Sequence, residues 1–396
     1  MERNNRISYI YFILMPDKTT LKQRVLNTFA HNKIDKIVFS PRLYYWYLGN
    51  SLFLKRNIEK KLKFEIPHQF LRKSQLEIYD YLHASPRYVM ETLYLPIIET
   101  KINSDAKIQV ISQKGSKPGE TITIHKTPIG NLTQITAVGG GLGVHFTEFP
   151  IKSLDDIKIM KYIMENTQII FSQDYYNKAK EQLEERGVVS DYLFSSPYQR
   201  MVKTQIGFVN TVILLKRYPN QIEDYIKFLE EWDDNMYDII AKSPYKIINF
   251  GENIDSNLSP HRYFGKYLVP YYEKRVKKLH NAGKYCHIHM DGSLRDLLPY
   301  LEDLPFDGLE ALTPEPQGDV TLEELHDSIG NKILLDGIPS ILFLPEYKWE
   351  YVKEYTLKVL ELFSPNLILG VSDELSPNGD IRKIEKISKL VQKFEL

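Results

Sequence analysis

Residues 285–292 read Tyr-Cys-His-Ile-His-Met-Asp-Gly, and this stretch decides how the fold is interpreted. His287, His289 and Asp291 occupy alternate positions, and alternate side chains of a β-strand lie on one face. Gly292 follows directly and lets the chain turn away. Burying three such groups without partners would be costly. We therefore expect a strand that carries chemistry, and an enzyme rather than a scaffold.

Short apolar runs alternate with amphipathic segments through the second half of the chain. Such alternation predicts parallel strands joined by helical crossovers. The expected helices are 220–243, 262–282, 294–303, 321–329, 348–363 and 381–394. The expected strands are 36–40, 189–194, 246–250, 285–290, 308–312, 333–337 and 367–371, with a poorly defined second strand completing eight.

The count of eight predicts an α/β protein with a (β/α)8 TIM barrel, in one domain spanning residues 1–396. An open, doubly wound sheet is the alternative, but no glycine-rich dinucleotide fingerprint follows any of these strands. Residues 107–150 differ, because three β-like runs there are separated by glycine and proline turns. We expect an antiparallel β insertion in the N-terminal third, covering the barrel mouth.

Composition restricts the classes of partner and compartment. Lys+Arg and Asp+Glu both number 51 in 396 residues, so no net charge attracts nucleic acid or an anionic membrane. The single cysteine, Cys286, excludes an internal disulfide and suits a reducing compartment. The apolar run 7–15 is short and lacks a small-residue cleavage site, and no run of about 18 apolar residues exists. We expect a cytoplasmic protein.

Ionisable side chains gather where the predicted strands end, which is where such barrels carry their chemistry. Each also has a plain structural explanation: Arg42 can pair with a barrel carboxylate, Glu252 can cap a helix, and the aromatic run 44–47 can pack in the core. Cys286 alternates out of phase with the histidines and is expected to pack on the other face. The strand ends carry Arg42 and Trp46, then Glu252, Asn253 and Asp255, then His287, His289 and Asp291, then Glu310, then Asp336, and last Asp373 and Glu374.

With these residues assembled, the chain resembles the uroporphyrinogen decarboxylase superfamily from about Lys22 onward. The resemblance is carried by Ser-Pro-Arg-Leu at 40–43, Gly-Glu-Asn-Ile-Asp at 251–255, His-Met-Asp-Gly at 289–292 and Asp-Gly-Leu-Glu-Ala at 307–311. It implies a single (β/α)8 barrel. It also implies one of two activities, corrinoid-linked methyl transfer with zinc or porphyrinogen decarboxylation.

In the zinc methyltransferases of this superfamily, a His-x-Cys-Gly segment and a late cysteine hold the metal. Here Asp291 stands in the first cysteine's place and Asp373 near the second, so the resemblance implies His289, Asp291 and Asp373 as metal ligands. Nitrogen and oxygen donors suit zinc or another divalent ion. His287 and Glu310 would be catalytic, orienting ligands or moving protons.

The decarboxylases of the superfamily hold substrate carboxylates with an arginine-rich segment after the first strand, where this chain has only Arg42 amid aromatic residues. One arginine suits a smaller substrate, aromatic or methylated. We expect the substrate to contact Arg42, Trp46, Glu252, Asn253 and Asp255.

The sequence thus predicts a metal-dependent methyltransferase of the corrinoid-linked type, acting on a small molecule. A separate corrinoid protein would be its partner, and a homodimer is compatible with this reading. The alternative is a uroporphyrinogen decarboxylase-like carboxy-lyase without metal. A third hypothesis is a binding protein that keeps the barrel without chemistry.

Overall fold

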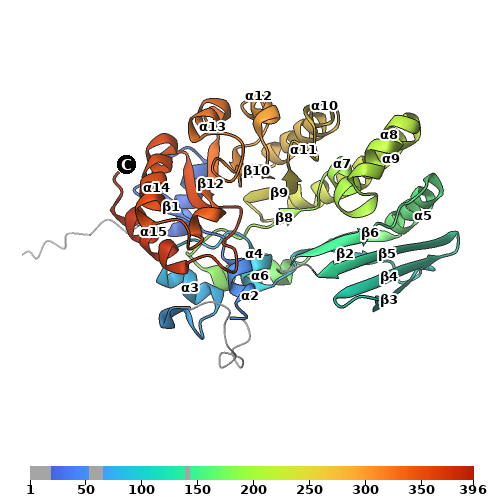
Figure 1. Cartoon of the computed structure of the whole chain (residues 1–396). Helices are drawn as coiled ribbons and strands as arrows, with labels where there is room; N and C mark the ends of the chain where they lie inside the picture. The colour runs from blue at the N-terminus through green and yellow to red at the C-terminus, as the bar shows by residue number, and fades with distance from the viewer. Residues whose placement is uncertain (1–18, 53–65, 139–142) are drawn as a thin grey trace, which may run out of the picture.

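The computed structural model describes residues 19–52, 66–138 and 143–396, so the apolar run 7–15 lies outside it. At its centre is a parallel sheet of seven strands, ordered β1-β13-β12-β11-β10-β9-β8 (Figure 1). All neighbouring pairs in it are parallel. Its strands are β1 (Val38–Phe39), β8 (Tyr192–Leu193), β9 (Ile247–Ile254), β10 (Tyr285–Met290), β11 (Gly308–Glu310), β12 (Ile333–Pro339) and β13 (Leu367–Ser372).

Helices pack against the outer face of this sheet, because β12 and β13 are buried along their whole length and need cover on both sides. For example, α11 contacts β10 and α14 contacts both β12 and β13. No described helix is both long and apolar enough to cross a membrane. The α-helices are α1 (Leu21–Phe29), α2 (Tyr44–Gly49), α3 (Gln75–Tyr81), α4 (Val89–Leu93), α5 (Leu154–Glu165), α6 (Gln173–Leu183), α7 (Pro197–Arg200), α8 (Phe208–Arg217), α9 (Pro219–Lys242), α10 (His261–Tyr263), α11 (Val269–Asn281), α12 (Leu298–Leu301), α13 (Leu322–Ile329), α14 (Trp349–Phe363) and α15 (Ile381–Lys393).

Short turns of other helix types join these elements. Two π-helical turns precede α8 and α11, and both continue directly from a short α-helix. These turns are η1 (His68–Phe70), η2 (Met201–Gln205), η3 (Phe264–Leu268), η4 (Arg295–Leu297) and η5 (Ser340–Phe343).

The predicted count of eight strands is corrected to seven in the described parallel sheet. The segment around Pro86 lies where the second strand is expected, between the two edge strands. Ser85 N–H donates to the carbonyl of Phe39 in β1 at 2.8 Å, and Val89 N–H donates to the carbonyl of Ser190, just before β8, at 3.1 Å. Because proline has no N–H, a regular hydrogen-bonded ladder cannot run through this segment.

The strands from β2 to β7 are antiparallel to their partners. Strands β2 (Ile98–Ile102) and β7 (Thr167–Phe171) pair with each other. Beyond them lies a sheet ordered β3-β4-β5-β6, which extends to one side of the parallel strands (Figure 1). Its strands are β3 (Gln109–Lys114), β4 (Glu120–Thr127), β5 (Gly130–Val138) and β6 (Val144–Glu148).

Candidate active site

A pocket of about 220 Å³ lies at the C-terminal ends of the parallel strands, and we name it the carboxylate pocket. Five of its lining side chains are acidic, against two lysine or arginine side chains and one histidine. None of the described residues of the 107–150 insertion lines it. It is lined by Arg42, Tyr44, Tyr45, Tyr88, Glu91, Tyr192, Lys203, Asn249, Gly251, Glu252, Asn253, His289, Glu310, Asp373 and Glu374.

The structure brings six of the sequence-predicted site residues to this pocket, from five different strand ends. They are Arg42, Glu252, Asn253, His289, Glu310 and Asp373. Of these, Glu252 is buried and its Oε1 accepts the backbone N–H of Ser196 at 2.8 Å, which fixes the carboxyl group against the preceding strand end. Burial raises the pKa of Glu252.

Glu310, at the end of β11, is the centre of the buried part of the site. Its Oε1 accepts hydrogen bonds from Arg87 Nη1 at 2.8 Å and from the Tyr88 hydroxyl at 2.5 Å. Its Oε2 accepts from the amide of Asn249 and lies 3.3 Å from His289 Nδ1. Burial opposes ionisation, but the hydrogen bond to His289 and the charge of Arg87 hold the pKa of Glu310 well below its usual range. Glu310 is therefore an ionised anchor for the groups around it.

His289, near the end of β10, is held between two carboxylates. Its Nδ1 faces Glu310 Oε2 at 3.3 Å, and its Nε2 faces Asp373 Oδ1 at 3.6 Å. Burial lowers the pKa of His289, but Asp373 and Glu310 outweigh this effect and raise it to about 9. Because Glu310 fixes Nδ1, Nε2 is the nitrogen directed toward the open pocket. A metal-ligating histidine is commonly oriented by a carboxylate in this way.

His287, two residues earlier on the same strand, is enclosed below the pocket. Its Nδ1 lies 3.1 Å from the amide nitrogen of Asn249, which can only donate, so Nδ1 accepts. Its ring stacks on Tyr88, with centroids 6.3 Å apart and planes 13° apart. Burial lowers the pKa of His287 to about 4, with Glu310 opposing the shift. His287 is thus a neutral, fixed imidazole, while His289 is cationic.

Arg42 follows β1 and its guanidinium is surrounded by three carboxyl groups. Its Nη2 lies 2.5 Å from Glu91 and 2.8 Å from Glu374, and its Nη1 pairs with Asp373. Burial raises the pKa of both Glu91 and Glu374, and attraction to Arg42 only partly offsets this. One guanidinium cannot neutralise three carboxylates, so this part of the pocket favours either retained protons or an added cation.

Two predicted substrate contacts lie outside the lining. Trp46 is 2% exposed and packs edge-to-face on Phe70 at 6.1 Å, because helix α2 turns it into the core. Asp255 accepts the N–H of Asn257 at 2.6 Å and so shapes the turn after β9. It also lies against Gly292, whose φ is +71°, and a side chain there would clash with the Asp255 carboxylate. Glycine at this position therefore allows the two loops to meet.

The residues expected to hold a metal offer one imidazole nitrogen and two carboxylates, which are donor types that bind divalent ions. His289 Nε2 and Asp373 Oδ1 are 3.6 Å apart, close to the separation of about 3.3–3.5 Å that two ligands adopt on one tetrahedral zinc ion. Asp291 Oδ1 is buried without a hydrogen-bond partner, but Asp291 does not line the pocket, and among the described residues the three predicted ligands do not form a group with all ligand atoms within 4.8 Å of one another. Burial raises the pKa of Asp291, and His289 opposes the shift. Asp373 also pairs with Arg42, so an ion would share it with the guanidinium.

Among the residues that the structure describes, a different group of three potential metal ligands lies close together. His280, Cys286 and Asp307 have potential ligand atoms within 4.8 Å of one another, at the N-terminal end of β10. Asp307 Oδ2 already accepts from Cys286 N at 2.6 Å and lies 2.9 Å from His280 Nε2. Burial raises the pKa of the Cys286 thiol well above its usual range. These contacts account for the trio as a structural cluster at the N-terminal ends of the parallel strands, remote from the carboxylate pocket.

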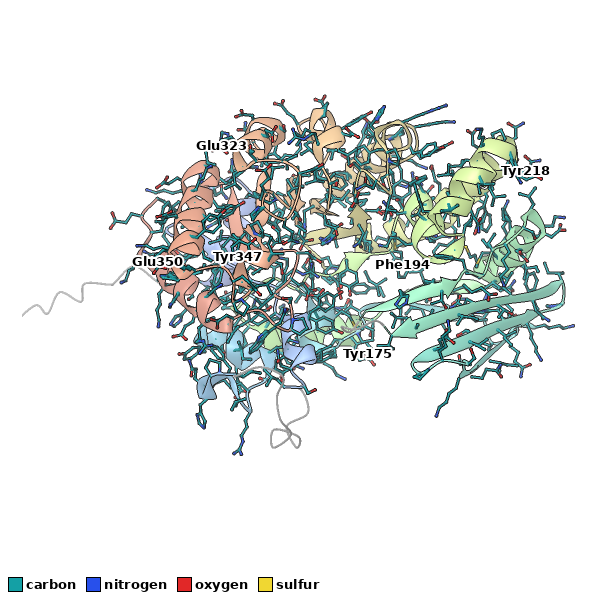
Figure 2. The ribbon with its side chains drawn as sticks, viewed as in Figure 1. Tyr175, Phe194, Tyr218, Glu323, Tyr347 and Glu350 are labelled. Carbon is teal, nitrogen blue, oxygen red and sulfur yellow. The ribbon has the colours of Figure 1, made fainter. Side chains whose placement is uncertain are left out.

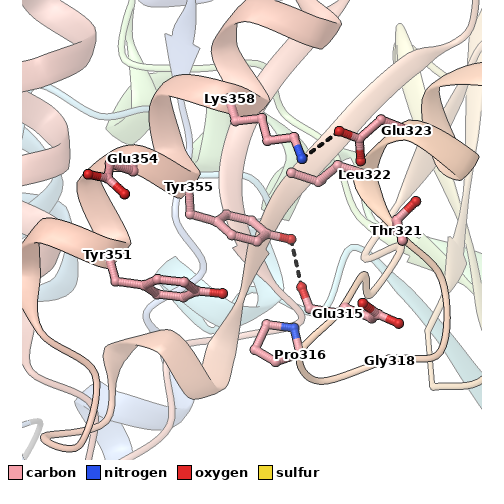
Figure 3. A pocket seen from close by; sticks show the side chains of 10 residues that line it. All are labelled: Glu315, Pro316, Gly318, Thr321, Leu322, Glu323, Tyr351, Glu354, Tyr355 and Lys358. Atoms are coloured by element: carbon pink, nitrogen blue, oxygen red, sulfur yellow. Dashed lines mark hydrogen bonds and ion pairs between the residues drawn. The ribbon is translucent and has the colours of Figure 1, made fainter.

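A larger pocket of about 640 Å³ lies beside helices α13 and α14 (Figure 3). Lys358 pairs with Glu323 at 2.5 Å, and the Tyr355 hydroxyl donates to the carbonyl of Glu315 at 2.9 Å. Both charged side chains are about half exposed, at 48% and 53%. Its lining therefore lacks the buried, interlocked charged groups of the carboxylate pocket.

Several residues of the site are not identified from the sequence. Arg87 and Tyr88 belong to the segment around Pro86, which has no strand pattern, although an arginine in an otherwise apolar run was a usable signal. Asn249 lies inside an apolar strand run, and Glu91 lies in the first turn of the short helix α4. Lys203 lies on the π-helical turn η2, where periodicity gives no guide to direction.

Comparison with known proteins gives the fold. No family model matches the chain, and no curated protein matches it in sequence. Among solved structures, a methyltransferase from Methanosarcina mazei superposes with a TM-score of 0.59 and 13% identity, covering 95% of this chain and 99% of that one. The two chains share a fold. This likeness shows a shared fold, and the superfamily that the sequence resembles stays a prediction.

A B12-independent methionine synthase from Shewanella sp. W3-18-1 is more distant, with a TM-score of 0.45 and 12% identity, covering 90% of this chain and 97% of that one. The full-length coverage of the Methanosarcina mazei structure means that the insertion and the parallel strands belong to one shared architecture. The chemistry of this chain has to be argued from its own side chains.

Proposed function

We propose that the carboxylate pocket is the active site of a metal-dependent methyltransferase acting on a small methylated substrate. The proposal includes a closed (β/α)8 barrel, in which the segment around Pro86 takes the place of the second strand. It also includes a corrinoid carried by a separate protein as the methyl carrier, and a cytoplasmic location in which Cys286 stays reduced.

The observation that carries the proposal is the fixed orientation of His289. Glu310 holds Nδ1 at 3.3 Å, so Nε2 points toward Asp373 and the excess of acidic groups in the pocket. Once His289 has given up its Nε2 proton, a ligand set of His289, Asp291 and Asp373 would hold a divalent cation, which would act as a Lewis acid on the heteroatom that carries the methyl group.

The chain's own residues would position the substrate. Tyr45 and Tyr192 line the pocket and are 39% and 42% exposed, so their ring faces are available at the mouth. Ring faces beside carboxylates favour a methylated group that bears positive charge. Below them, the hydrogen bonds from Arg87, Tyr88 and Asn249 keep Glu310 in place while the substrate enters and leaves.

The carboxy-lyase alternative is less well supported because of Arg42. In that mechanism Arg42 holds a substrate carboxylate, but both of its terminal nitrogens already pair with Glu91, Asp373 and Glu374. A second carboxylate would have to displace one of these, at a cost typical of breaking a buried pair.

Elemental analysis of the purified protein without an affinity tag tests the metal. We expect about one equivalent of zinc or another divalent ion. His289→Ala and Asp291→Ala should each lose it. His280→Ala is the matched control, because it removes a histidine from the cluster at the other end of β10. Loss of metal in His280→Ala alone, or no metal after reconstitution, would contradict the proposal.

Methyl transfer is tested with free cob(I)alamin in place of the corrinoid protein. Small methylated amines, sulfides and phenyl ethers are offered as donors, and formation of methylcobalamin is followed by its absorbance. Transfer that depends on the metal and is lost in His289→Ala would support the proposal. Release of carbon dioxide from an acid substrate by metal-free protein would support the alternative.

A further inference from the structure

A second pocket, of about 670 Å³, lies between the antiparallel region and the parallel sheet, and we name it the insertion pocket. Ile102, His125 and Ile163 line it from the antiparallel side. Phe194 and Trp232 line it from the other side. Figure 2 places Phe194 where the parallel strands approach the antiparallel sheet.

The two walls of the insertion pocket are joined by hydrogen bonds. Trp232 Nε1 donates to the carbonyl of Met164 at 2.9 Å, which fixes α9 against α5. Ile151 N–H donates to the carbonyl of Gln205 at 2.9 Å, which fixes the end of the insertion against η2. The pocket is therefore part of the packed structure.

The charges that line the insertion pocket are opposite to those of the carboxylate pocket. No aspartate or glutamate from the described ranges lines it, whereas two cations do, Arg200 and Lys203. Arg200 already has a counter-ion, because it pairs with Asp233 at 2.5 Å, and it lies over the Trp232 ring at 5.4 Å.

Lys203 is the lining cation for which no ion pair with a carboxylate is found among the described residues. Its Nζ contacts three uncharged oxygens, at 3.0 Å from Ser195 Oγ, 3.1 Å from Asn253 Oδ1 and 3.5 Å from the carbonyl of Gly251, so an anionic group would replace one of these contacts. Burial lowers the pKa of Lys203, and the charges of Glu252 and Asp291 oppose this shift.

Lys203 also lies where the two pockets meet. Tyr192, Lys203 and Gly251 line both of them. A molecule bound in the insertion pocket can therefore present one end to the carboxylate pocket while an anionic group contacts Lys203 Nζ.

We propose that the insertion pocket is a second ligand site, which takes a small molecule with an apolar, preferably aromatic, body and an anionic group bound by Lys203. The apolar body would lie against Ile102, Ile163, Phe194 and Trp232. This inference rests on the proposed function in one respect, because it takes the ligand to be a reactant or product of the carboxylate pocket. Binding itself requires neither metal nor turnover.

The probes that test it are 4-(1-naphthyl)butyrate and its uncharged amide, measured by titration calorimetry against the intact protein. We expect the carboxylate to bind about tenfold more tightly than the amide, as a charge-assisted hydrogen bond allows. Lys203→Met should abolish this preference and leave the affinity for the amide unchanged. Lys180→Met, on the exposed face of α6, is the matched control and should change neither.

Filling the pocket gives an independent test. Ile102→Trp should weaken the binding of both probes about tenfold, because the larger side chain occupies space that the naphthyl ring needs. A tenfold loss of affinity corresponds to about 1.4 kcal/mol of binding free energy. Thr100→Trp is the second filling variant, because Thr100 is exposed and its replacement carries little folding risk. Equal affinity in wild type and both filling variants, or no binding at millimolar probe, would overturn the inference. A protein that binds the carboxylate as expected but takes up no metal on reconstitution would overturn only the proposed function.

Discussion

The carboxylate pocket and the insertion pocket share three residues, yet their chemistry is opposite. The first is about 220 Å³, built from strand ends, and its charged groups are interlocked. The second is about 670 Å³, largely apolar, and its available cation touches only uncharged oxygens. The difference suggests a division of labour, in which the parallel strands would supply reacting groups, and β2, β7 and α5 would supply much of the surface that selects a ligand.

The largest expected effect compares the two cations. Arg42→Met should lower the free energy of unfolding by about 3–5 kcal/mol, because it leaves Glu91, Asp373 and Glu374 without their counter-charge. Lys203→Met should cost less than about 1 kcal/mol, because its partners are uncharged. Urea unfolding of both variants measures this, and equal costs would remove the distinction between the pockets.

The next effect concerns the anchor of His289. Glu310→Gln should lower metal affinity about 10- to 100-fold, because the imidazole loses the charged group that orients it. Competition with a chromogenic chelator measures the affinity. Glu323→Gln, which changes an exposed partner of Lys358, is the matched control. An unchanged affinity in Glu310→Gln would mean that the metal binds elsewhere.

A smaller effect is expected when a negative charge is placed in the insertion pocket. Ile102→Glu should weaken binding of 4-(1-naphthyl)butyrate by about 1 kcal/mol more than Ile102→Gln does. The affinity for the uncharged amide probe should differ much less between the two variants. Metal content should stay the same in both, and a joint loss of metal and probe would show that the pockets are not separable.

The last effect concerns an acid directly beside the shared residue Tyr192. Burial raises the pKa of Asp191 to about 8, so it is protonated in the folded protein at neutral pH and ionised in the unfolded chain. Stability therefore falls as pH rises from about 4 to about 8. Asp191→Asn should remove that slope, so it should stabilise the protein more at pH 8.5 than at pH 4. Thermal unfolding at the two pH values measures it, and an equal gain at both would exclude titration of Asp191 as the cause.

The sequence predicted the second half of the fold well because strand and helix periodicities are strong there. Strand β10 has the predicted bounds, Tyr285–Met290, and Cys286 packs away from the histidines as its alternation indicates. The convergence of strand ends also placed His289, Glu310 and Asp373 at one pocket. Their chemical roles stay predictions.

The remainder of the site depends on information that local patterns do not hold. The segment around Pro86 supplies Arg87 and Tyr88 from an irregular extended stretch, since proline prevents a ladder that periodicity would reveal. Trp46 and Tyr45 are adjacent in an aromatic run, and only the packing of α2 decides which of them faces the pocket. Lys203 is placed by a π-helical turn, for which the sequence offers no period.

The pairing of β2 with β7 has a consequence for how this protein can change. Ile102 and Thr167 are direct partners, so the segment between them begins and ends at neighbouring points of the fold. We call residues 103–166 a cassette, because its replacement by a short turn would leave the pairings among the parallel strands unchanged. Ligand range could then diversify by swapping or trimming this cassette, without any substitution among the groups that hold His289.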